Sequence, residues 1–323
     1  MNLPNSFSGA PEPAPVIALA GPTGSGKTAL ALALCERAQC EIINADSRQL
    51  YADFPVISAQ PTREEQSRAS HHLYGFLSLE QKYDAMKWAR EAALRAREIW
   101  SRGRAPVLVG GTGFYFHTLF CGISPMPIID REIAGPIWEE MKISGPLKAY
   151  ENLREIDPAY AASIHPHDRQ RIGRALEVCL SSGKTFSWWR ARPLCGQFAT
   201  GPLFVLKTTL AEIVPNLKRR IELMLAAGAA EEARSAWQKE RDLSLPGWSC
   251  IGARECLAME QGKITPEIAK GNWLRDTRAY AKRQITWFRS RKNAIFIEPG
   301  EFVDRALAFL AHSPLIKNYG NVQ

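Results

Sequence analysis

The sequence predicts an α/β protein in which a parallel β-sheet is flanked by helices and a mainly helical domain is inserted into the chain. Three observations lead to this fold class. An apolar stretch at residues 16–20 runs into a glycine-rich loop and then into a helix-forming segment. Further apolar stretches alternate with helical patterns, which is typical of parallel sheets. Between residues 124 and 200 the strand signals stop, and helical patterns punctuated by proline take their place.

The expected core elements follow in order along the chain. Strands are predicted at 16–20, 41–44 and 106–109, and a further strand begins near Leu203. The segment GGTGFYF follows the third strand, and its Thr112 can cap a helix running towards Cys121. Helices are predicted by apolar spacing over the ranges 27–38, 83–102, 214–227, 229–240, 251–261 and 266–289.

The patterns divide the 323 residues into a loose tail, a core and an insertion. The tail is expected at 1–15, the core at 16–123 and 201–323, and the helical insertion at 124–200. The tail lacks the basic start and apolar middle of a secretory signal. No apolar run approaches the roughly 20 residues that span a bilayer. The seven cysteines form no CxxC pair and no zinc-like spacing, so we expect reduced thiols and a cytoplasmic protein.

The glycine-rich loop GPTGSGKT, Gly21 to Thr28, fits the P-loop motif and lies between strand and helix, where that motif functions. Its backbone N–H groups and the helix N-terminus form an anion cradle, Lys27 adds a charge, and the Thr28 hydroxyl can hold Mg²⁺. No aspartate ends the later strand PVLV, so the usual partner of triphosphate hydrolysis is missing. The predicted diphosphate-binding residues are Gly21, Thr23, Gly24, Ser25, Gly26, Lys27 and Thr28.

The segment ADSRQLY follows the second strand, at the sheet edge that faces ligands in open α/β folds. Asp46 is therefore expected to point into the cleft. An aspartate before a serine is also a common turn or cap residue, so Asp46 has a second, purely structural interpretation. Thr112 is ambiguous in the same way, because it either only caps its helix or also reaches a substrate.

The net charge of +8 matters only if the basic residues gather. On a helix spanning 271–292, the four residues Arg275, Arg278, Lys282 and Arg289 fall on one face, and aromatic and aliphatic side chains fall on the other. Such a stripe suits contacts to nucleic-acid phosphates, although a plain solvated face is the alternative. A second basic cluster occurs in the insertion, in HDRQRIGR.

Six blocks in this order resemble the bacterial type of the tRNA dimethylallyltransferase (tRNA isopentenyltransferase) family. They are GPTGSGKT, EIINADSRQLY, HHL, PVLVGGTGFYF, IHPHDRQRIGRALEV and TRAYAKRQITWFR. The resemblance implies transfer of a dimethylallyl group from its diphosphate to the exocyclic amine of the adenine 3′ of a tRNA anticodon. It also implies a P-loop kinase-like core, an insertion that grips the anticodon stem-loop, Mg²⁺ as cofactor, no membrane partner and a monomeric state.

The resemblance also assigns roles to individual residues. Asp46 is the expected general base, Thr112 is expected to bond the bridging oxygen of the diphosphate, and Arg220 is expected to contact the diphosphate. Without the resemblance, Arg220 would pass for a solvated charge on a helix. The expected tRNA contacts are Asp46, Ser47, Arg48, Gln49, Gln170, Arg171, Ile172, Gly173, Arg174, Arg275, Arg278, Lys282, Arg283 and Arg289.

The chain departs from the family pattern at five positions. These are Pro55, Gln60, Tyr74, Asn216 and Ala253. The departures at Pro55 and Gln60 predict altered substrate contacts from the loop that carries them. The departure at Ala253 predicts weaker stacking against the tRNA loop.

Two other kinds of protein share part of this pattern. A small-molecule P-loop kinase or adenylate-directed prenyltransferase would need the loop and Asp46 but neither the insertion nor the basic stripe. An RNA-binding or regulatory protein with a degenerate nucleotide site would not need to keep Lys27, Thr28, Asp46 and Thr112 together.

Overall fold

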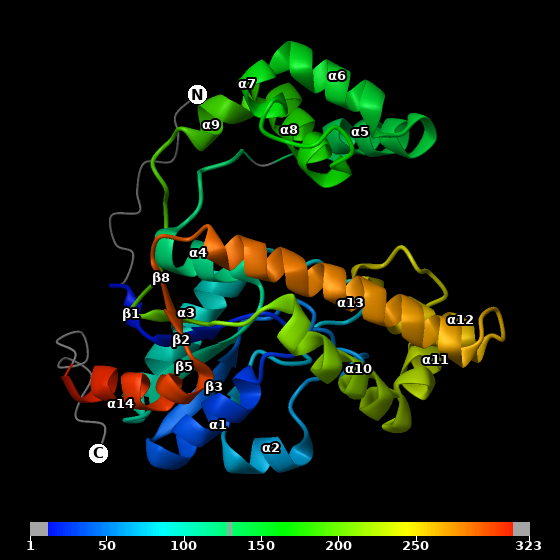
Figure 1. Cartoon of the computed structure of the whole chain (residues 1–323). Coiled ribbons are helices and arrows are strands. Elements are labelled where there is room, and N and C mark those ends of the chain that lie inside the picture. The colour runs from blue at the N-terminus through cyan, green and yellow to red at the C-terminus, as the bar shows by residue number, and fades with distance from the viewer. Residues whose placement is uncertain (1–11, 128, 130, 313–323) are drawn as a thin grey trace. The chain divides into compact units, whose positions relative to one another are not determined.

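The computed structural model describes residues 12–127, 129 and 131–312, and Figure 1 traces their helices and strands. The chain divides into two compact units. One is the insertion, Cys121–Gly196, and the other contains the chain before and after it. Each unit is built around its own buried apolar residues.

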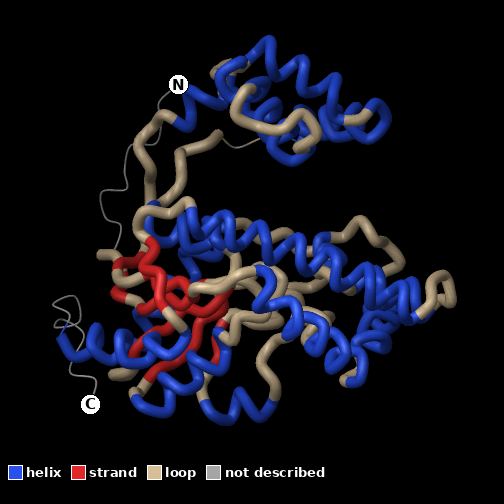
Figure 2. Tube along the Cα trace, viewed as in Figure 1, coloured by secondary structure: helices blue, strands red, loops and turns tan. Residues whose placement is uncertain are grey.

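The larger unit is organised by a six-stranded parallel sheet, shown in red in Figure 2. Its strands lie in the order β4-β3-β5-β2-β7-β8, and neighbouring strands all run parallel. Their bounds are β4 His71–His72, β3 Cys40–Asn44, β5 Ala105–Gly110, β2 Ile17–Ala20, β7 Leu203–Leu206 and β8 Ala294–Ile297. The four central strands are buried along their whole length, as expected for a sheet covered on both faces. The predicted α/β class is confirmed.

A second, two-stranded sheet lies near the amino-terminal end of the described chain. It pairs β1 (Ala14–Pro15) with β6 (Ala199–Thr200), and Ala14 is fully buried. The expected loose tail at 1–15 is therefore wrong for its last two residues, because both are held by backbone pairing. Residues 1–11 of that predicted tail lie outside the described residues.

The helices of the larger unit surround the main sheet. α1 and α14 share one apolar cluster with the sheet, which includes Leu32, Phe204 and Phe302. Their bounds are α1 Lys27–Arg37, α2 Arg63–Arg68, α3 Ala85–Ser101, α4 Gly113–Cys121, α10 Leu210–Ala226, α11 Ala229–Lys239, α12 Ala253–Glu260, α13 Pro266–Arg289 and α14 Phe302–His312, with 3₁₀ turns η1 Pro246–Ser249 and η2 Pro299–Glu301.

The long helix α13 is seated on glycines. A Cβ atom at Gly111 would come within 2.1 Å of the Gln284 amide, one at Gly113 within 2.2 Å of the Trp287 ring, and one at Gly252 within 2.1 Å of Trp273. No real Cβ atom approaches so closely, so side chains of α13 occupy the space that larger residues would fill. The helix can lie this close to the GGTG loop only because the loop lacks side chains there.

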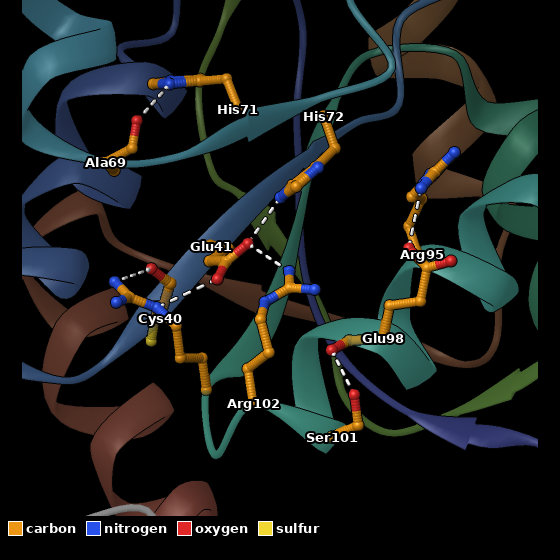
Figure 3. Close-up of polar contacts among 10 residues, drawn as sticks. Cys40, Glu41, Ala69, His71, His72, Arg95, Glu98, Ser101 and Arg102 are labelled. Atoms are coloured by element: carbon orange, nitrogen blue, oxygen red, sulfur yellow. Dashed lines mark hydrogen bonds and ion pairs between the residues drawn. The ribbon is translucent and has the colours of Figure 1, made fainter.

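A buried carboxylate ties together the amino ends of the strands, away from the glycine loops. Glu41 on β3 accepts from His72 at 2.6 Å and from Arg102 at 2.8 Å, as Figure 3 shows, and Arg104 lies 3.1 Å away. Burial acts to raise the pKa of the Glu41 carboxyl, but the hydrogen bonds from Arg102 and His72 hold it below its usual value. The short edge strand β4 and the turn between α3 and β5 are thereby fixed to β3.

The insertion is a compact group of five helices with its own apolar cluster. Leu153, Ile172, Val178 and Trp189 are among its buried residues. The bounds are α5 Arg131–Ser144, α6 Pro146–Ile156, α7 Pro158–Ala161, α8 Arg169–Ser182 and α9 Phe186–Arg190. Chain entry and exit lie side by side, because Ile123 and Cys195 exchange both backbone hydrogen bonds at 3.0 Å.

Within the described residues, no helix is both long enough and apolar enough to cross a bilayer.

Candidate active site

The glycine loop and the carboxyl ends of the central strands open into a cavity of about 770 Å³ within the larger unit. Ligands bind at this edge in open α/β folds, and the volume lies in the usual range for a ligand pocket. The cavity has a charged side and an apolar side. Lys27, Asp46 and Arg220 belong to the first, whereas Ile213, Leu217, Ile221 and Met224 of α10 belong to the second.

The P-loop takes the conformation that its glycines permit. Gly24 and Gly26 have φ angles of 80° and 83°, a region that favours glycine, and Gly26 precedes the first residue of α1. The Lys27 ammonium donates to the carbonyl oxygens of Gly21 and Pro22 at 3.0 and 2.7 Å. Burial lowers the pKa of Lys27 to about 8, with Arg220 lowering it further and Asp46 opposing the shift. Residues Thr23 to Thr28 line the cavity together, whereas Gly21 is buried and does not line it.

Both interpretations of Asp46 apply, since it is a turn residue and it also faces the cavity. It follows β3 in a turn where one carboxylate oxygen accepts from the Arg48 N–H at 2.9 Å. The same side chain lines the cavity together with the P-loop. Its main chain is fixed by Asn44, whose side-chain oxygen accepts from the Asp46 N–H at 2.8 Å and whose amide donates to the Asp46 carbonyl at 3.0 Å.

Thr112 lies beside this turn. Its hydroxyl oxygen accepts from the Ser47 N–H at 2.9 Å and donates to the Ser47 hydroxyl at 3.3 Å. The Thr112 side chain is therefore bonded to the segment that carries Asp46, and α4 begins at the next residue. Ser47 and Thr112 join the ends of β3 and β5 into one rigid edge.

Arg220 is a half-buried residue that reaches the P-loop from α10, so the solvated-charge interpretation is wrong. Its guanidinium donates to the Thr23 hydroxyl at 3.3 Å. Burial lowers the pKa of Arg220 and Asp46 opposes the shift, as expected for charges gathered around one cavity. Asn216, one turn earlier on α10 and one of the five departures from the family pattern, lines the same cavity.

Three site residues escaped the sequence analysis. Buried Gln284 bonds both the P-loop and the GGTG loop. The hydroxyl of Tyr280, one turn earlier on α13, bonds the Thr112 side chain, and burial near Asp46 raises the pKa of Tyr280. Asn44 lies on a strand and looked like an ordinary strand residue. Only the apolar periodicity of α13 hinted that residues 280 and 284 face inward, and periodicity does not identify their partners.

The departures from the family pattern have local explanations. The Gln60 side-chain amide donates to the Tyr51 carbonyl at 2.8 Å, and its backbone N–H donates to the Pro55 carbonyl at 2.8 Å, so Gln60 and Pro55 both build the loop. Tyr74 lines the cavity, and burial and Asp46 raise the pKa of its hydroxyl. Ala253 is fully buried at the start of α12, where it offers no exposed surface for stacking.

The residues predicted to contact tRNA near Asp46 are engaged within the protein. The Arg48 guanidinium donates to the Ser249 hydroxyl, and the Gln49 amide donates to the Ser58 and Ala59 carbonyls. Both side chains also line the cavity.

The stripe on α13 has the exposure that the sequence predicted. Its four residues Arg275, Arg278, Lys282 and Arg289 are all exposed, and so is Arg283, the other residue of this helix expected to contact tRNA. Arg275 is bonded to Asp276 at 2.8 Å, so the charge of that arginine is partly matched. The helix ends at Arg289 and does not continue to residue 292, because Ser290 closes it.

The insertion residues separate into two groups. Gln170 and Arg171 are exposed, and half-buried Arg174 is paired with Glu177 at 3.1 Å. Ile172 is fully buried, and a Cβ atom at Gly173 would come within 2.7 Å of Trp138. The prediction of tRNA contacts is wrong for the side chain of Ile172, and Gly173 packs against Trp138, because this face of α8 forms the core of the insertion.

The donor set around Thr28 fits Mg²⁺ of the kind that nucleotide-site loops hold. Thr28 is exposed in the first turn of α1, and both Thr28 and Asp46 line the cavity. Nowhere in the described ranges do three His, Cys, Asp or Glu side chains gather as a metal cage. Magnesium bound mainly by phosphate oxygens and water needs only one or two protein ligands, so the residues present suffice.

Family models and individual relatives agree on one family. A model described as IPP transferase matches residues 49–291, and one described as isopentenyl transferase matches residues 14–74. A tRNA dimethylallyltransferase of Desulfovibrio desulfuricans is 49% identical over 89% of each chain. One of Nitratidesulfovibrio vulgaris (strain DP4) is 46% identical over 90% of this chain and 94% of its own.

Solved structures are similar as well. The full-length tRNA isopentenylpyrophosphate transferase of Bacillus halodurans aligns with a TM-score of 0.64 and 27% identity, over 94% of this chain and 97% of its own. The matched blocks include the P-loop, the Asp46 turn and α13, whose geometry is described above. The chain belongs to the tRNA dimethylallyltransferase family, a group of prenyl-transferring enzymes.

Proposed function

We propose that this chain transfers a dimethylallyl group from dimethylallyl diphosphate to the exocyclic amine of the adenine 3′ of the anticodon in tRNA. One observation carries the proposal: a closed P-loop and the Asp46 carboxylate face the same cavity of about 770 Å³. The cavity can hold a diphosphate against the loop while a carboxylate faces the acceptor.

The reaction breaks the bond between the allylic carbon and the diphosphate oxygen and forms a bond from that carbon to the adenine nitrogen. Charge grows on the departing diphosphate, and Lys27, the loop amides and the Arg220 guanidinium lie where they can stabilise it. The Thr112 hydroxyl is bonded to Ser47 and does not line the cavity, so contact with the bridging oxygen requires it to exchange its bond to the Ser47 hydroxyl. The leaving group departs as diphosphate, and no water needs activation.

The acceptor amine is a weak nucleophile because its lone pair is delocalised into the purine ring. Asp46 accepts the amine proton as the new bond forms, which is general-base catalysis. Its second carboxylate oxygen is the one to take the proton, because the first already accepts from the Arg48 N–H. The Asn44 contacts hold the Asp46 backbone still during this step.

Magnesium, when bound at Thr28, would supply positive charge to the diphosphate oxygens. Thr28 would hold the ion through its hydroxyl, and phosphate oxygens and water would complete the coordination. Lys27 and Arg220 of this chain provide the remaining charge on the donor side.

The tRNA is proposed to lie along the exposed basic residues of α13, with the insertion contacting the anticodon stem-loop. The reacting adenine must leave its stack to enter the cavity. We propose residues 16–123 and 201–323 as the catalytic core, 124–200 as the tRNA-gripping insertion, a monomer as the working form, and the cytoplasm as its location, where the unpaired cysteines remain reduced.

One assay tests the proposal. Unmodified tRNA is incubated with the protein, dimethylallyl diphosphate and Mg²⁺, digested, and analysed for prenylated adenosine at the position 3′ of the anticodon. A prenylated nucleoside is expected. Turnover of labelled ATP without a prenylated product would instead favour a small-molecule kinase.

A further inference from the structure

We infer that Gln284 is a positioning residue, which holds the diphosphate loop at a fixed spacing from the loop that carries Thr112. The inference rests on the proposed function, because it assigns Gln284 to the donor side of that same site. Gln284 does not line the cavity, so it acts through the two loops that it joins.

The geometry is a bridge between segments far apart in the sequence. The Gln284 side-chain oxygen accepts from the Thr23 N–H at 2.9 Å, and its amide nitrogen donates to the Gly111 carbonyl at 2.9 Å. The residue is only 4% exposed, so water does not compete for these bonds. Without this side chain, the N–H of half-buried Thr23 and the buried carbonyl of Gly111 would both lose this partner.

A carboxamide meets both requirements at this length and at any pH. Thr23 presents a donor and Gly111 presents an acceptor, so the bridging group must accept at one atom and donate at the other, as a carboxamide does. Gly111 leaves room for it, since a Cβ atom there would come within 2.1 Å of the amide nitrogen.

The bridge determines which part of Thr23 faces the phosphates. The Thr23 N–H is directed to Gln284 and not into the anion cradle, while its hydroxyl accepts from Arg220 at 3.3 Å. Gln284 therefore orients the Thr23 hydroxyl and, through it, the guanidinium expected to contact the diphosphate. The neighbouring turn of α13 holds the other loop, because Tyr280 bonds the Thr112 side chain.

The test compares Gln284→Glu and Gln284→Met with the parent protein. An ionised glutamate still accepts from the Thr23 N–H but places an oxygen against the Gly111 carbonyl. A protonated glutamate donates to that carbonyl and restores both bonds. Because burial raises the pKa of a carboxyl group, this protonation is expected in the accessible pH range. Methionine fills the space without either bond.

The measurement is the affinity for inorganic diphosphate by calorimetry, together with the KM values for dimethylallyl diphosphate and tRNA. At pH about 8, Gln284→Glu is expected to bind diphosphate about tenfold more weakly than the parent. The diphosphate affinity of Gln284→Glu should approach that of the parent as the pH falls towards about 6, because protonation of the glutamate restores both bonds. The KM for tRNA should change little, and Gln284→Met should remain weak at every pH.

Ile285→Met is the matched control. Ile285 is a half-buried residue of α13, so this change alters the packing of the helix without removing the bond to Thr23 or the bond to Gly111. It is expected to bind diphosphate like the parent. Two outcomes would overturn the inference. One is a ratio of diphosphate affinities, Gln284→Glu to parent, that does not change with pH. The other is an equal rise in KM for dimethylallyl diphosphate and for tRNA in a variant that circular dichroism shows to be folded. Diphosphate binding needs no catalysis, so the test still applies if the tRNA assay fails and the proposed reaction is wrong.

Discussion

At the scale of single residues, the sequence was most informative where one motif fixes both backbone and chemistry. Gly24, Gly26, Lys27 and Asp46 line the cavity, as the local pattern predicted, whereas Gly21 does not. Gln284 could not be found in this way, because its partners Thr23 and Gly111 lie 261 and 173 residues away in the chain. A buried amide shows its importance only when the loops it bridges are seen together.

Replacing the proposed general base is the most direct test at this scale. Asp46→Ala should lower turnover by roughly two or more orders of magnitude, since it removes the proposed acceptor of the amine proton. Binding of tRNA should be nearly unchanged, and single-turnover prenylation with a filter-binding assay measures both. Asp304→Ala is the control. The Asp304 carboxylate on α14 is exposed, is paired with Arg37 of α1, and does not line the cavity. Near-normal turnover of the Asp46 variant would remove this residue from the mechanism.

Lys27 predicts a pH dependence. Its pKa is lowered by burial from 10.5 to about 8, and only the charged form attracts diphosphate. Affinity for inorganic diphosphate should therefore fall as the pH rises through about 8, as measured by calorimetry. In Lys27→Met this fall should be absent.

Protein stability should respond to Lys27 in the opposite sense. The folded protein holds the Lys27 proton less tightly than the unfolded chain does, so below pH about 8 the charged lysine lowers the free energy of unfolding. This loss disappears as the pH rises from about 8 towards 10.5. Chemical denaturation of the parent and of Lys27→Met measures this effect. The difference between their free energies of unfolding should become smaller as the pH rises across this range. A constant difference would mean that Lys27 is not desolvated.

At the scale of elements, α13 combines a predictable outer face with an unpredictable inner one. The period of its apolar residues located the helix and its basic stripe, and both agree with the structure. Its close approach to Gly111, Gly113 and Gly252 could not be predicted, because a glycine in a loop signals a turn as readily as a contact. β8 was also missed: Ala294–Ile297 are all apolar, but so short an apolar run does not by itself identify a strand, and only Ile297 of the four is buried.

The outer face of α13 predicts a salt dependence. Lys282→Ala should weaken tRNA binding and reduce the slope of log K against log salt by about one, the value for one lost phosphate contact. Titrations at several salt concentrations measure this slope. Lys87→Ala, which removes an exposed charge from α3 that does not line the cavity, should leave it unchanged. Equal slopes for Lys282→Ala and the parent would place the RNA elsewhere.

At the scale of the whole molecule, the chain consists of two units with separate cores. The sequence indicated the insertion, because strand patterns cease there and helical patterns take their place. The order of the six parallel strands could not be read from it, since residues 71–72 and 294–297 join the two edges of the sheet through contacts with no sequence signature.

Separate cores predict separable damage. Gly173→Val should disrupt the insertion, because even a Cβ atom would come within 2.7 Å of Trp138, and overpacking typically costs about 1–3 kcal/mol. Prenylation of tRNA should fall sharply, whereas diphosphate binding by the larger unit should persist. Calorimetric titration and proteolysis with mass spectrometry distinguish the two units. Loss of diphosphate binding in parallel with tRNA prenylation would mean that the two units fold as one.

The antiparallel bridge between Ile123 and Cys195 holds the two chain ends of the insertion together. Because the chain enters and leaves the insertion at paired residues, a loop between its helices can change in length without moving those two ends apart. The insertion can therefore accept added or deleted residues between its helices while its connection to the rest of the chain stays the same.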